Sequence, residues 1–489
     1  MGLKGPKPVP FLGNSIYWLL KQRWFLDVEW DRKYGQIYGL YESNVPVLVV
    51  SRPDLIKAIM VKDFQMFINR RVRPASHPVL SQSIFHTRGE NWRRIRAIVS
   101  PAFSTAKMRK MYPMVRHCVR ALMKHVEDKE SGDCVDIKKV LGNYTMDVIA
   151  AVAFATNTDA HNDQNSAFVT AARQVLDIDI VRMIVILLLP KWLVKAMGIK
   201  SRAPESANQF FIDISRRLIR ERKADPNSRQ KYNDFIQLLV DARPEDRDAE
   251  ATADANAFNE SEEDLAIRRQ MLSSSAKKLT LTEDEMVAQV WVFFIAGYDT
   301  TSATLSFCIY ELALNAVIQD RLYDEVMAAV DADGEIGYDE LLKMPYLDAI
   351  LSETGRKYPP VATVERQAVA EYQLADTGIT LPAGQEIEIP VYAVHHNPDY
   401  YPDPETFNPD RFMPDNRHNI QPYTYLPFGA GPRNCLGMRV ALMKAKLCVV
   451  HLIQKYKFAI IPKTSVPLKF EISIITLIPG DVHIGFTKR

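Results

Sequence analysis

Apolar residues follow a helical spacing over much of the chain, most clearly in two stretches. Residues 287–315 are apolar on nearly every side, which predicts a buried central helix. Residues 282–285 supply a capping threonine and an acidic first turn, so we expect that helix to begin there. From Leu436 onward, apolar residues recur at intervals of three and four residues, which predicts a second long helix. These apolar positions are Val440, Leu442, Met443, Leu447, Val450 and Ile453.

Shorter stretches alternate between apolar and polar residues and indicate strands. Residues 37–41 and 47–50 predict two short strands, followed by a helix that opens near Pro53. Residues 104–180 are mostly helical in pattern, and a further helix begins near Asn91. Segments punctuated by Gly and Pro predict small sheets, over residues 372–394 and 458–486. Together these elements predict a mainly α fold with small β-sheets.

Three segments depart from this pattern. Residues 1–14 are rich in proline and glycine. Residues 180–198 are strongly apolar but contain Arg182, Pro190 and Lys191, so they form either a core segment or one that dips into a membrane. Residues 241–278 are acidic and alanine-rich at their start and predict a flexible surface connection. Because no clear linker divides residues 1–489, we expect a single domain.

Composition excludes some classes of protein. With 47% hydrophobic and 25% charged residues, the chain has an ordinary globular composition with a large core. The formal net charge of +2 gives no signal for nucleic-acid binding. Five cysteines are odd in number and show no paired or metal-ligand spacing, which fits a reducing compartment. The chain opens with neither a signal peptide nor an apolar run long enough to span a membrane.

The densest candidate chemistry lies in residues 428–437. Gly431 and Gly437 lack a Cβ, so the backbone can approach a large planar partner, and the intervening proline stiffens that approach. Cys435 stands at the start of the second predicted helix, where free N–H groups and the positive dipole end favour a thiolate. Arg433 supplies a fixed cation suited to a carboxylate.

With the ring of Phe428 added, this set describes a haem site with a cysteine axial ligand. Such a ligand pushes electron density onto iron and favours O–O cleavage. A lone cysteine is otherwise a buried, inert side chain. The surrounding glycines, arginine and aromatic ring favour the haem site over that alternative.

A second candidate lies in the middle of the central helix. Gly297 costs such a helix roughly 1 kcal/mol relative to alanine and therefore needs a reason. Ala296 and Thr300 share a face, so the Thr300 hydroxyl can bond the Ala296 carbonyl and leave a place for water. A threonine bonded in this way can be purely structural. The neighbouring Asp299, the small-residue notch and the haem ligand elsewhere favour an oxygen-activating site.

Two charged pairs have both an ordinary and a functional interpretation. Trp92 and Arg96 are four residues apart on one helix face and could form a surface cation–π contact or bind an anion. Glu353 and Arg356 could form a surface salt bridge of little energetic worth or a buried network.

These patterns resemble those of the cytochrome P450 family. Phe-x-x-Gly-x-Arg-x-Cys-x-Gly at residues 428–437 is similar to its haem-binding signature, and residues 296–301 to its distal-helix signature. Glu353-x-x-Arg356, followed by residues 409–412, is similar to its buried Glu–Arg–Arg network. The motifs occur in family order, so the resemblance covers essentially the whole chain. The chain looks most like the animal microsomal group that oxidises drugs, steroids and other xenobiotics, a family 3-like group.

The resemblance implies a mainly α, single-domain fold with haem b, iron protoporphyrin IX, between the long central helix and the cysteine loop. It assigns the iron ligand to Cys435 and proton delivery to Asp299 and Thr300. It places further cofactor contacts at Trp92, Arg96, Arg366, Arg433 and Arg71 for the propionates, and at Phe428, Gly429, Gly437 and Ala296. Its structural network comprises Glu353, Arg356 and Arg411, with Gly355 as a departure where a larger apolar residue is expected. Its substrate-lining candidates are Phe85, Ile295, Ala296, Val361, Ile475 and Thr476.

The resemblance also implies monooxygenation of a lipophilic small molecule, with NADPH-derived electrons delivered by a membrane-bound flavoprotein reductase. It implies a place on the cytoplasmic face of the endoplasmic reticulum membrane, an N-terminal anchor removed ahead of residues 1–14, and membrane contact by residues 180–198. A basic helix face could steer the reductase or be merely solvated, with Arg93, Arg94, Lys444 and Lys446 as its residues.

Two other functions compete with monooxygenation. Some relatives are haem-thiolate isomerases that rearrange lipid peroxides, but the intact pair of Asp299 and Thr300 argues against that role. A non-catalytic haem sensor or carrier is the other, and the complete set of oxygen-activating motifs argues against it.

Overall fold

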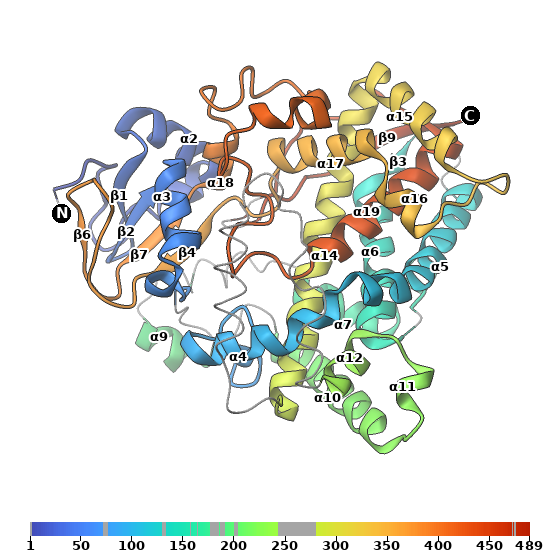
Figure 1. Cartoon of the computed structure of the whole chain (residues 1–489), viewed down its shortest axis with the longest axis horizontal. Helices are drawn as coiled ribbons and strands as arrows, with labels where there is room; N and C mark the ends of the chain where they lie inside the picture. The colour runs from blue at the N-terminus through green and yellow to red at the C-terminus, as the bar shows by residue number, and fades with distance from the viewer. Residues whose placement is uncertain are drawn as a thin grey trace.

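A computed structural model of the protein describes residues 2–71, 77–129, 134–156, 158–163, 165–176, 185, 191–199, 204–242, 280–471, 473 and 476–489. Most helices gather on one side of the molecule and the main sheet lies on the other (Figure 1). The long helix α14 (Glu283–Leu314) runs through the helical side, where it packs against several other helices.

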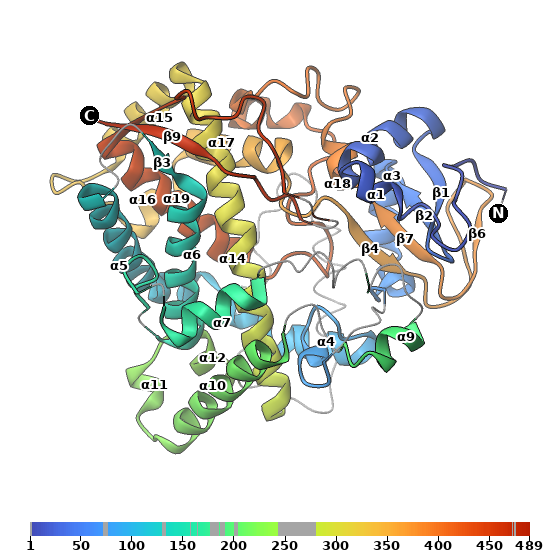
Figure 2. The same cartoon turned by 180° about the vertical axis from the view of Figure 1, so that it is seen from behind.

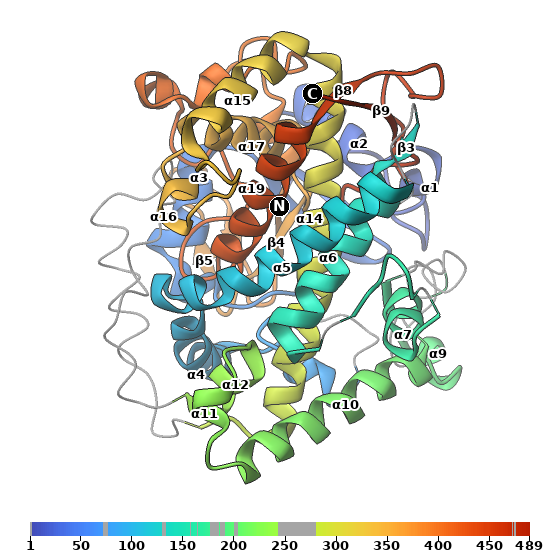
Figure 3. The ribbon, with the colours of Figure 1, turned by 90° about the vertical axis from the view of Figure 1, so that its right-hand side faces the viewer.

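The helical side is built around α14. Its helices are α5 (Thr105–Lys129), α6 (Ile137–Phe154), α7 (Ala167–Leu176), α10 (Glu205–Ala224), α11 (Ser228–Lys231), α12 (Phe235–Asp241), α15 (Ala316–Ala329), α16 (Tyr338–Leu342), α17 (Pro345–Lys357) and α19 (Met438–Lys455). α4 (Gly89–Val99) and α9 (Lys191–Ala196) lie at the edge nearest the sheet (Figures 1 and 2). α14 contacts α6, α10, α17 and α19, and Figure 3 shows it flanked by α6 and α19.

The main sheet has the order β1-β2-β7-β4, formed by β1 (Ile37–Glu42), β2 (Val45–Val50), β7 (Glu386–Ile389) and β4 (Val364–Gln367). β1 and β2 pair antiparallel, β2 and β7 pair parallel, and β4 pairs antiparallel to β7. Short helices surround this sheet (Figure 2), namely α1 (Tyr17–Leu20), α2 (Arg23–Tyr34), α3 (Pro53–Lys57) and α18 (Val391–His395). Two smaller sheets consist of β3 (Val135–Asp136), β9 (His483–Lys488) and β8 (Tyr456–Ala459), and of β5 (Tyr372–Gln373) and β6 (Thr380–Leu381).

Alternation along β7 separates charge from the core. Ile387 and Ile389 are buried in an apolar cluster with residues of β2 and α3. Glu386 and Glu388 therefore share the opposite face, since successive strand residues point to opposite sides. On β4, Glu365 lies opposite Glu388 and Arg366 lies opposite Ile387. The sheet thus sorts its charged residues onto two faces.

The N-terminus of α14 is fixed by a capping box. The Thr282 hydroxyl accepts from the Glu285 amide at 3.2 Å, and the Glu285 carboxylate accepts from the Thr282 amide at 2.8 Å. Among the described residues, α14 is the one helix long and apolar enough to cross a membrane by length and composition. In this structure it packs in the protein interior against other helices.

The predicted fold class is confirmed, since the chain is mostly helical with small sheets. The predicted strands and the starts of the helices near Pro53, near Asn91 and at Glu283 are confirmed within a few residues. The small sheet predicted within residues 372–394 corresponds to the strands β5, β6 and β7, and the strand pattern ends at Ile389, because α18 begins at Val391 directly after Pro390. Residues 243–279 and most of residues 180–198 lie outside the described residues, and the single domain stays a prediction.

Candidate active site

The segment before α19 folds back on itself. The Cys435 amide donates to the Phe428 carbonyl at 2.9 Å, and the Asn434 amide donates to the Gly431 carbonyl at 3.0 Å. Phe428 is half-buried, and the Cys435 side chain is accessible although the loop lies deep in the protein. The chain therefore holds one thiol at the surface of an internal loop, as a ligand to a large group requires.

The glycines of this loop have specific packing reasons. Gly431 has φ +70°, and a Cβ there would stand 2.0 Å from the Met60 carbonyl oxygen, so no other residue fits. Its close neighbour is thus protein backbone, which corrects the prediction of a planar partner at Gly431. Gly429 also has a positive φ, of +72°. A Cβ on Gly437 would lie 4.0 Å from Phe293, which places the loop against α14.

The electrostatics of Cys435 differ from the prediction made from its helix. Burial raises the pKa of the Cys435 thiol, and this is opposed by the Gly437 N–H and by the positive charges of Arg96, Arg70 and Lys444. α19 begins only after Gly437, so one backbone N–H, and not a whole helix terminus, faces the sulfur. A coordinating metal ion deprotonates a thiol outright, and iron would supply the ionisation that burial resists.

Arginines surround the loop. Arg96 donates from Nη1 to the Asn434 carbonyl at 3.0 Å and from Nη2 to the Asn434 side chain at 2.8 Å. Arg433 donates to the Thr87 carbonyl at 2.8 Å, and its guanidinium lies 5.0 Å from the ring of the buried Trp92. Trp92, Arg96 and Arg433 therefore lie close to this loop, and Arg96 fixes the position of Asn434 beside Cys435.

Positive charge is concentrated around this loop. We call the set Arg70, Arg88, Arg96, Arg366 and Arg433 the arginine cluster. Arg366 is buried, and among the described residues no acceptor meets its Nε or Nη2. Burial and the nearby Arg70 lower the pKa of Arg366 to about 9, and burial and four other arginines lower that of Arg433 to about 7. A buried cation of this kind favours an anion, and the propionates of a haem bound at Cys435 would fit beside it.

Arg71 does not belong to this cluster, which corrects its assignment to a propionate. It donates to the carboxylates of Glu365 at 2.8 Å and Glu388 at 2.9 Å and also contacts Glu42 and Glu386. Arg23 forms ion pairs with two of these carboxylates, Glu42 and Glu388, and lies 3.7 Å from the carboxylate of Asp27. We call Asp27, Glu42, Glu365, Glu386 and Glu388, with Arg23 and Arg71, the acidic cluster. Both Nη atoms of Arg71 are engaged by protein carboxylates.

Sequence reasoning missed Arg70 and Arg88. Asn69 pairs antiparallel with Gln367, and continuing that register sets Arg71 opposite Glu365 and Arg70 opposite Arg366. Neighbours along an extended chain point to opposite sides, so only one of the two adjacent arginines can face the cysteine loop. The doublet itself signals an arginine at this place, but only the register against β4 shows that Arg71 faces the carboxylates.

The middle of α14 is less buried than the turns that follow it. Ala296 is exposed and Thr300 half-buried, and the Thr300 hydroxyl donates to the Ala296 carbonyl at 2.6 Å, as predicted. A Cβ on Gly297 would lie 2.5 Å from Ile149 Cδ1, so close packing on α6 explains this glycine. Asp299 is half-buried beside Thr300. This turn therefore presents an accessible face on a helix that is otherwise largely buried.

The substrate-lining candidates are only partly brought together. Val361 and Thr476 form an antiparallel β-bridge. Phe85 has 41% of its surface exposed, and its carbonyl accepts from Arg433 at 3.2 Å, which puts it beside the arginine cluster. Ile295 is half-buried on α14. Ile475 lies outside the described residues, and the lining role of the set stays a prediction.

The charged pair on α17 is buried, which decides between its two interpretations. Arg356 and Glu353 are 0% exposed and form a bidentate pair, with Nε–Oε2 at 2.7 Å and Nη2–Oε1 at 2.8 Å. Arg411 approaches Glu353 at 3.7 Å, and the Asn408 amide donates to it at 2.9 Å. This is the predicted Glu–Arg–Arg arrangement, and its multiple hydrogen bonds compensate the desolvation of the buried charges.

His395, which the sequence did not single out, joins this network to the cysteine loop. Its Nε2 accepts from the Leu426 amide at 2.7 Å, so the proton is on Nδ1, which donates to the Arg356 carbonyl at 3.0 Å. Burial and the charge of Arg356 lower the pKa of His395 to about 3, which keeps the ring neutral.

Close packing explains why Gly355 stands where the family pattern predicts a larger apolar residue. A Cβ at Gly355 would lie 3.2 Å from Pro427 Cβ and 3.5 Å from the Tyr425 hydroxyl. The segment leading to Cys435 therefore rests directly on α17, and a larger residue would push it away.

The predicted basic docking face is wrong for its two lysines. Lys444 and Lys446 are only 1% and 3% exposed, because α19 is packed between other helices. Lys446 pairs with Asp348 at 2.7 Å, and Arg93 pairs with Glu90 at 2.9 Å. Arg94 pairs with Glu285. These cations are occupied within the protein.

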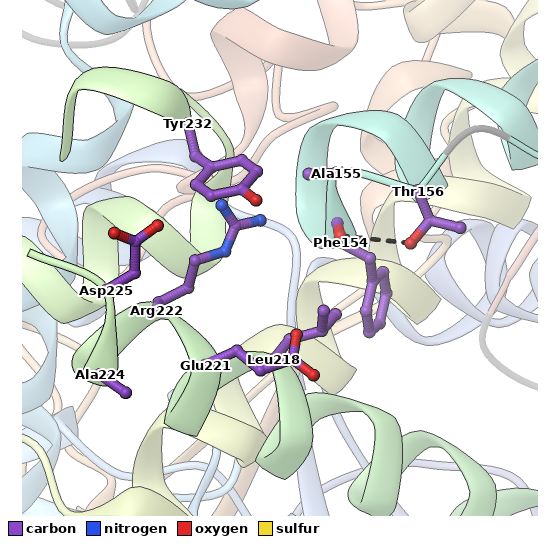
Figure 4. Close-up of a pocket in the computed structure, with 9 residues that line it drawn as sticks. All are labelled: Phe154, Ala155, Thr156, Leu218, Glu221, Arg222, Ala224, Asp225 and Tyr232. Carbon is purple, nitrogen blue, oxygen red and sulfur yellow. Dashed lines mark hydrogen bonds between the residues drawn. The ribbon is translucent and has the colours of Figure 1, made fainter. Parts of the chain in front are cut away.

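A cavity of about 490 Å³ lies elsewhere, at the ends of α6 and α10. Figure 4 shows Arg222 reaching from α10 toward the ring of Tyr232, and its guanidinium also pairs with Asp234 at 3.1 Å. Glu221 and Asp225 line the same cavity. None of the predicted site residues borders it, and its charges are of both signs, so it indicates no particular ligand.

Comparison with known proteins agrees with this site. The profile of the cytochrome P450 family matches residues 3–263 and 255–486. The chain is 35% identical to cytochrome P450 3A9 of Rattus norvegicus over 476 residues, which cover 96% of this chain and 88% of that protein. It is 36% identical to cytochrome P450 3A11 of Mus musculus over 475 residues, and 32% identical to cytochrome P450 3A56 of Fundulus heteroclitus over 503 residues. These matches cover 96% and 100% of this chain, and 88% and 93% of those proteins. The accessible thiol, the arginine cluster and the buried Glu–Arg pair thus occur in a chain that belongs to the cytochrome P450 family, as a haem-thiolate monooxygenase.

Proposed function

We propose that the protein inserts one oxygen atom into lipophilic small molecules such as drugs, steroids or fatty acids, with electrons from NADPH delivered by a flavoprotein reductase. The observation that carries this proposal is the partly open turn of α14 at Ala296 and Thr300, on the helix that the cysteine loop contacts through Gly437. A binder without turnover has no need for a hydroxyl and an acid at such a turn.

When bound through Cys435, haem supplies an electron-rich iron that favours O–O cleavage. Around it, Arg366 and Arg433 would hold the propionates, and Arg96 fixes Asn434 beside Cys435. Glu353 and Arg356 hold the backbone behind the loop through His395.

Proton delivery falls to the turn of α14. The Thr300 hydroxyl donates its hydrogen bond to the Ala296 carbonyl at 2.6 Å. Rotation about χ1 would turn the O–H toward the open side of the helix. Asp299, next in the chain, can return a proton to that hydroxyl through water.

The candidate lining suggests the class of substrate. Phe85, Ile295, Ala296 and Val361 are apolar, and Thr476 adds one hydroxyl. A wall of this kind selects by size and hydrophobicity and has few polar groups to fix one orientation. We therefore expect several lipophilic substrates with modest positional selectivity.

We further propose that the protein works on the cytoplasmic face of the endoplasmic reticulum membrane, where a membrane-bound reductase and lipophilic substrates meet. The resemblance to microsomal relatives supports this. Lys444 and Lys446 are buried and are left out of the reductase-binding surface.

The testing experiment is turnover with purified reductase, NADPH and a panel of steroids, fatty acids and drugs under ¹⁸O₂. Label in the product, dependent on reductase and NADPH, is expected. Rearrangement of a lipid hydroperoxide without NADPH or label would instead assign the chain to the isomerases. Haem binding without turnover of any panel member would favour a sensor.

Thr300→Ala tests the proton-delivery role within the same assay. We expect NADPH consumption to continue while the product per NADPH falls about tenfold or more and hydrogen peroxide rises. The matched control is Thr304→Ala, which removes the same kind of bond, from the Thr304 hydroxyl to the Thr300 carbonyl at 2.8 Å. Equal coupling in both variants would make Thr300 merely structural.

A further inference from the structure

A buried glutamine of α14 holds a segment that lies far away in the chain. Gln289 is 1% exposed, and its side-chain oxygen accepts from the Ile84 amide at 2.7 Å. Its side-chain nitrogen donates to the Gln82 carbonyl at 3.0 Å and to the Glu285 carbonyl of its own helix at 2.8 Å. Both hydrogens and the oxygen of this amide are therefore in use, and the reversed amide would set its N–H against that of Ile84.

The same segment is attached on its other side to the cysteine loop. Arg433 donates from Nη2 to the Phe85 carbonyl at 3.2 Å and to the Thr87 carbonyl at 2.8 Å. Phe85 thus lies between two attachments, one on α14 and one on the loop that carries Cys435. The Arg70 guanidinium lies 4.3 Å from the centre of the Phe85 ring, and 41% of the surface of Phe85 is exposed. Because the backbone on both sides is held, the ring has a defined place beside the arginine cluster.

The attachment on α14 lies on the same helix face as the accessible turn. Gln289 and Ala296 are seven positions apart, which is close to two helical turns and about 10 Å along the axis. Ala296 is exposed, and Thr300 follows one turn later on that face. The segment that carries Phe85 is therefore fixed to the helix two turns before the oxygen-activating residues.

We propose that Gln289 is a positioning residue that fixes the backbone of residues 82–84 and so sets the place of the Phe85 ring beside the accessible turn of α14. This rests on the proposed monooxygenase function and adds to it a residue that determines which lipophilic molecules fit. Gln289 acts through Phe85 and does not itself touch substrate. A wall that is already in place costs a ligand less to bind than a wall that the ligand has to order.

Hydrogen exchange tests the attachment in the haem-loaded, substrate-free enzyme. Gln289→Leu keeps a side chain of similar size and removes both hydrogen bonds to residues 82–84. We expect amide exchange in residues 82–85 to become about tenfold faster, since the Ile84 amide loses its acceptor. Gln289→Met removes the same two bonds and takes the place of the leucine variant if that variant does not fold.

Ligand binding tests the consequence for Phe85. Imidazole and clotrimazole, an imidazole that carries three aromatic rings, both bind haem iron through a ring nitrogen, and haem absorption reports their affinities. Gln289→Leu should weaken clotrimazole binding about tenfold and imidazole binding less than about twofold, because only the larger ligand needs the wall. Phe85→Ala should have a similar effect, and the double variant should bind no more weakly than Phe85→Ala. Additive losses in the double variant would show that Gln289 does not act through Phe85, and the proposal would fall.

α15 supplies a matched control. Gln319 is 0% exposed, accepts from the Phe458 amide at 2.8 Å, and donates to the carbonyls of Phe458 at 2.9 Å and Leu312 at 2.8 Å. Gln319→Leu breaks the same kind of attachment, to β8, and should leave exchange in residues 82–85 and the ratio of the two affinities at their wild-type values.

The proposal is overturned if Gln289→Leu leaves either quantity unchanged, or if Gln319→Leu alters the affinity ratio equally. Neither measurement uses reductase, NADPH or oxygen. The positioning role can therefore fail while monooxygenation stands, and the reverse also holds.

Discussion

The two faces of β4 carry opposite excesses of charge. Glu365 points into the acidic cluster, where carboxylates outnumber Arg23 and Arg71. Arg366, the next residue, points into the arginine cluster, where described acceptors are backbone and amide oxygens. The clusters are adjacent and each contains buried charges, yet only the acidic cluster can change its net charge by binding protons.

The difference lies in the chemistry of the two ions. A carboxylate in excess binds a proton, and burial together with neighbouring carboxylates raises the pKa of Asp27 to about 7 and also raises that of Glu386. An arginine does not release its proton in proteins. Among the described residues, Arg366 therefore stays a buried cation without a carboxylate partner, and this is why we propose the arginine cluster as the propionate site. The acidic cluster, by contrast, connects segments of the fold.

The largest expected effect comes from breaking the acidic cluster. Arg71→Met leaves Glu365 and Glu388 without their shared cation and should lower the free energy of unfolding by about 3–5 kcal/mol, measured by chemical denaturation. Haem retention should be unchanged. Arg52→Met, at an exposed ion pair, is the control and should cost at most about 1 kcal/mol. Haem loss from Arg71→Met at wild-type stability would return this residue to the propionates.

The protonation of Asp27 gives the next effect. Its pKa in the folded protein, about 7, is above the ordinary 3.8, so the stability it contributes is full below about pH 4 and is lost as the pH rises to about 7. Asp27→Asn removes this dependence and should gain stability over the wild type by up to about 1.4 kcal/mol per pH unit in that window. Urea titrations across pH measure it. The exposed Asp415→Asn should show no such trend, and an equal trend there would refute the assignment to Asp27.

Arg366→Met tests the arginine cluster and should act in the opposite sense to Arg71→Met. Removing an unbalanced buried cation should raise the unfolding free energy of the haem-free protein by about 1–3 kcal/mol. Haem affinity should fall about 10–100-fold, because a charge-assisted contact to a propionate is lost. Transfer of haem to a scavenging protein measures the affinity. A variant that loses stability and keeps its haem would show that Arg366 serves the fold alone.

The smallest effect is expected at the rim of the arginine cluster. Arg88 is exposed and acts on Arg433 through solvent. Arg88→Met should weaken haem retention by less than about threefold, and the difference should vanish near 1 M salt. An effect as large as that of Arg366→Met would show that Arg88 also contacts the cofactor directly.

Features of the fold and the site that depend on residues close together in the chain could be predicted from the sequence. The capping residues at Thr282 placed the start of α14, and the spacing of Ala296 and Thr300 placed their hydrogen bond. The loop around Cys435 was likewise recognisable from its own residues.

The predictions that failed concern residues whose surroundings are set by contacts between distant segments of the chain. The choice between Arg70 and Arg71 depends on their register against β4, which neither residue reveals. Lys444 and Lys446 look solvent-facing by residue type, but α19 is enclosed by other helices. The reason for a glycine at position 355 is contact with Pro427, which the sequence does not reveal because Pro427 lies far along the chain.

His395 makes the cofactor loop sensitive to acid. Its pKa of about 3 in the fold lies below the ordinary 6.5, so the stability that the neutral ring contributes is complete above about pH 6.5 and is lost as the pH falls toward 3. A proton added at Nε2 would set two N–H groups against each other, that of the ring and that of Leu426. Acid would therefore break the hydrogen bond that holds the backbone before Cys435. We expect the protein to lose its haem at a higher pH than the one at which its helices unfold.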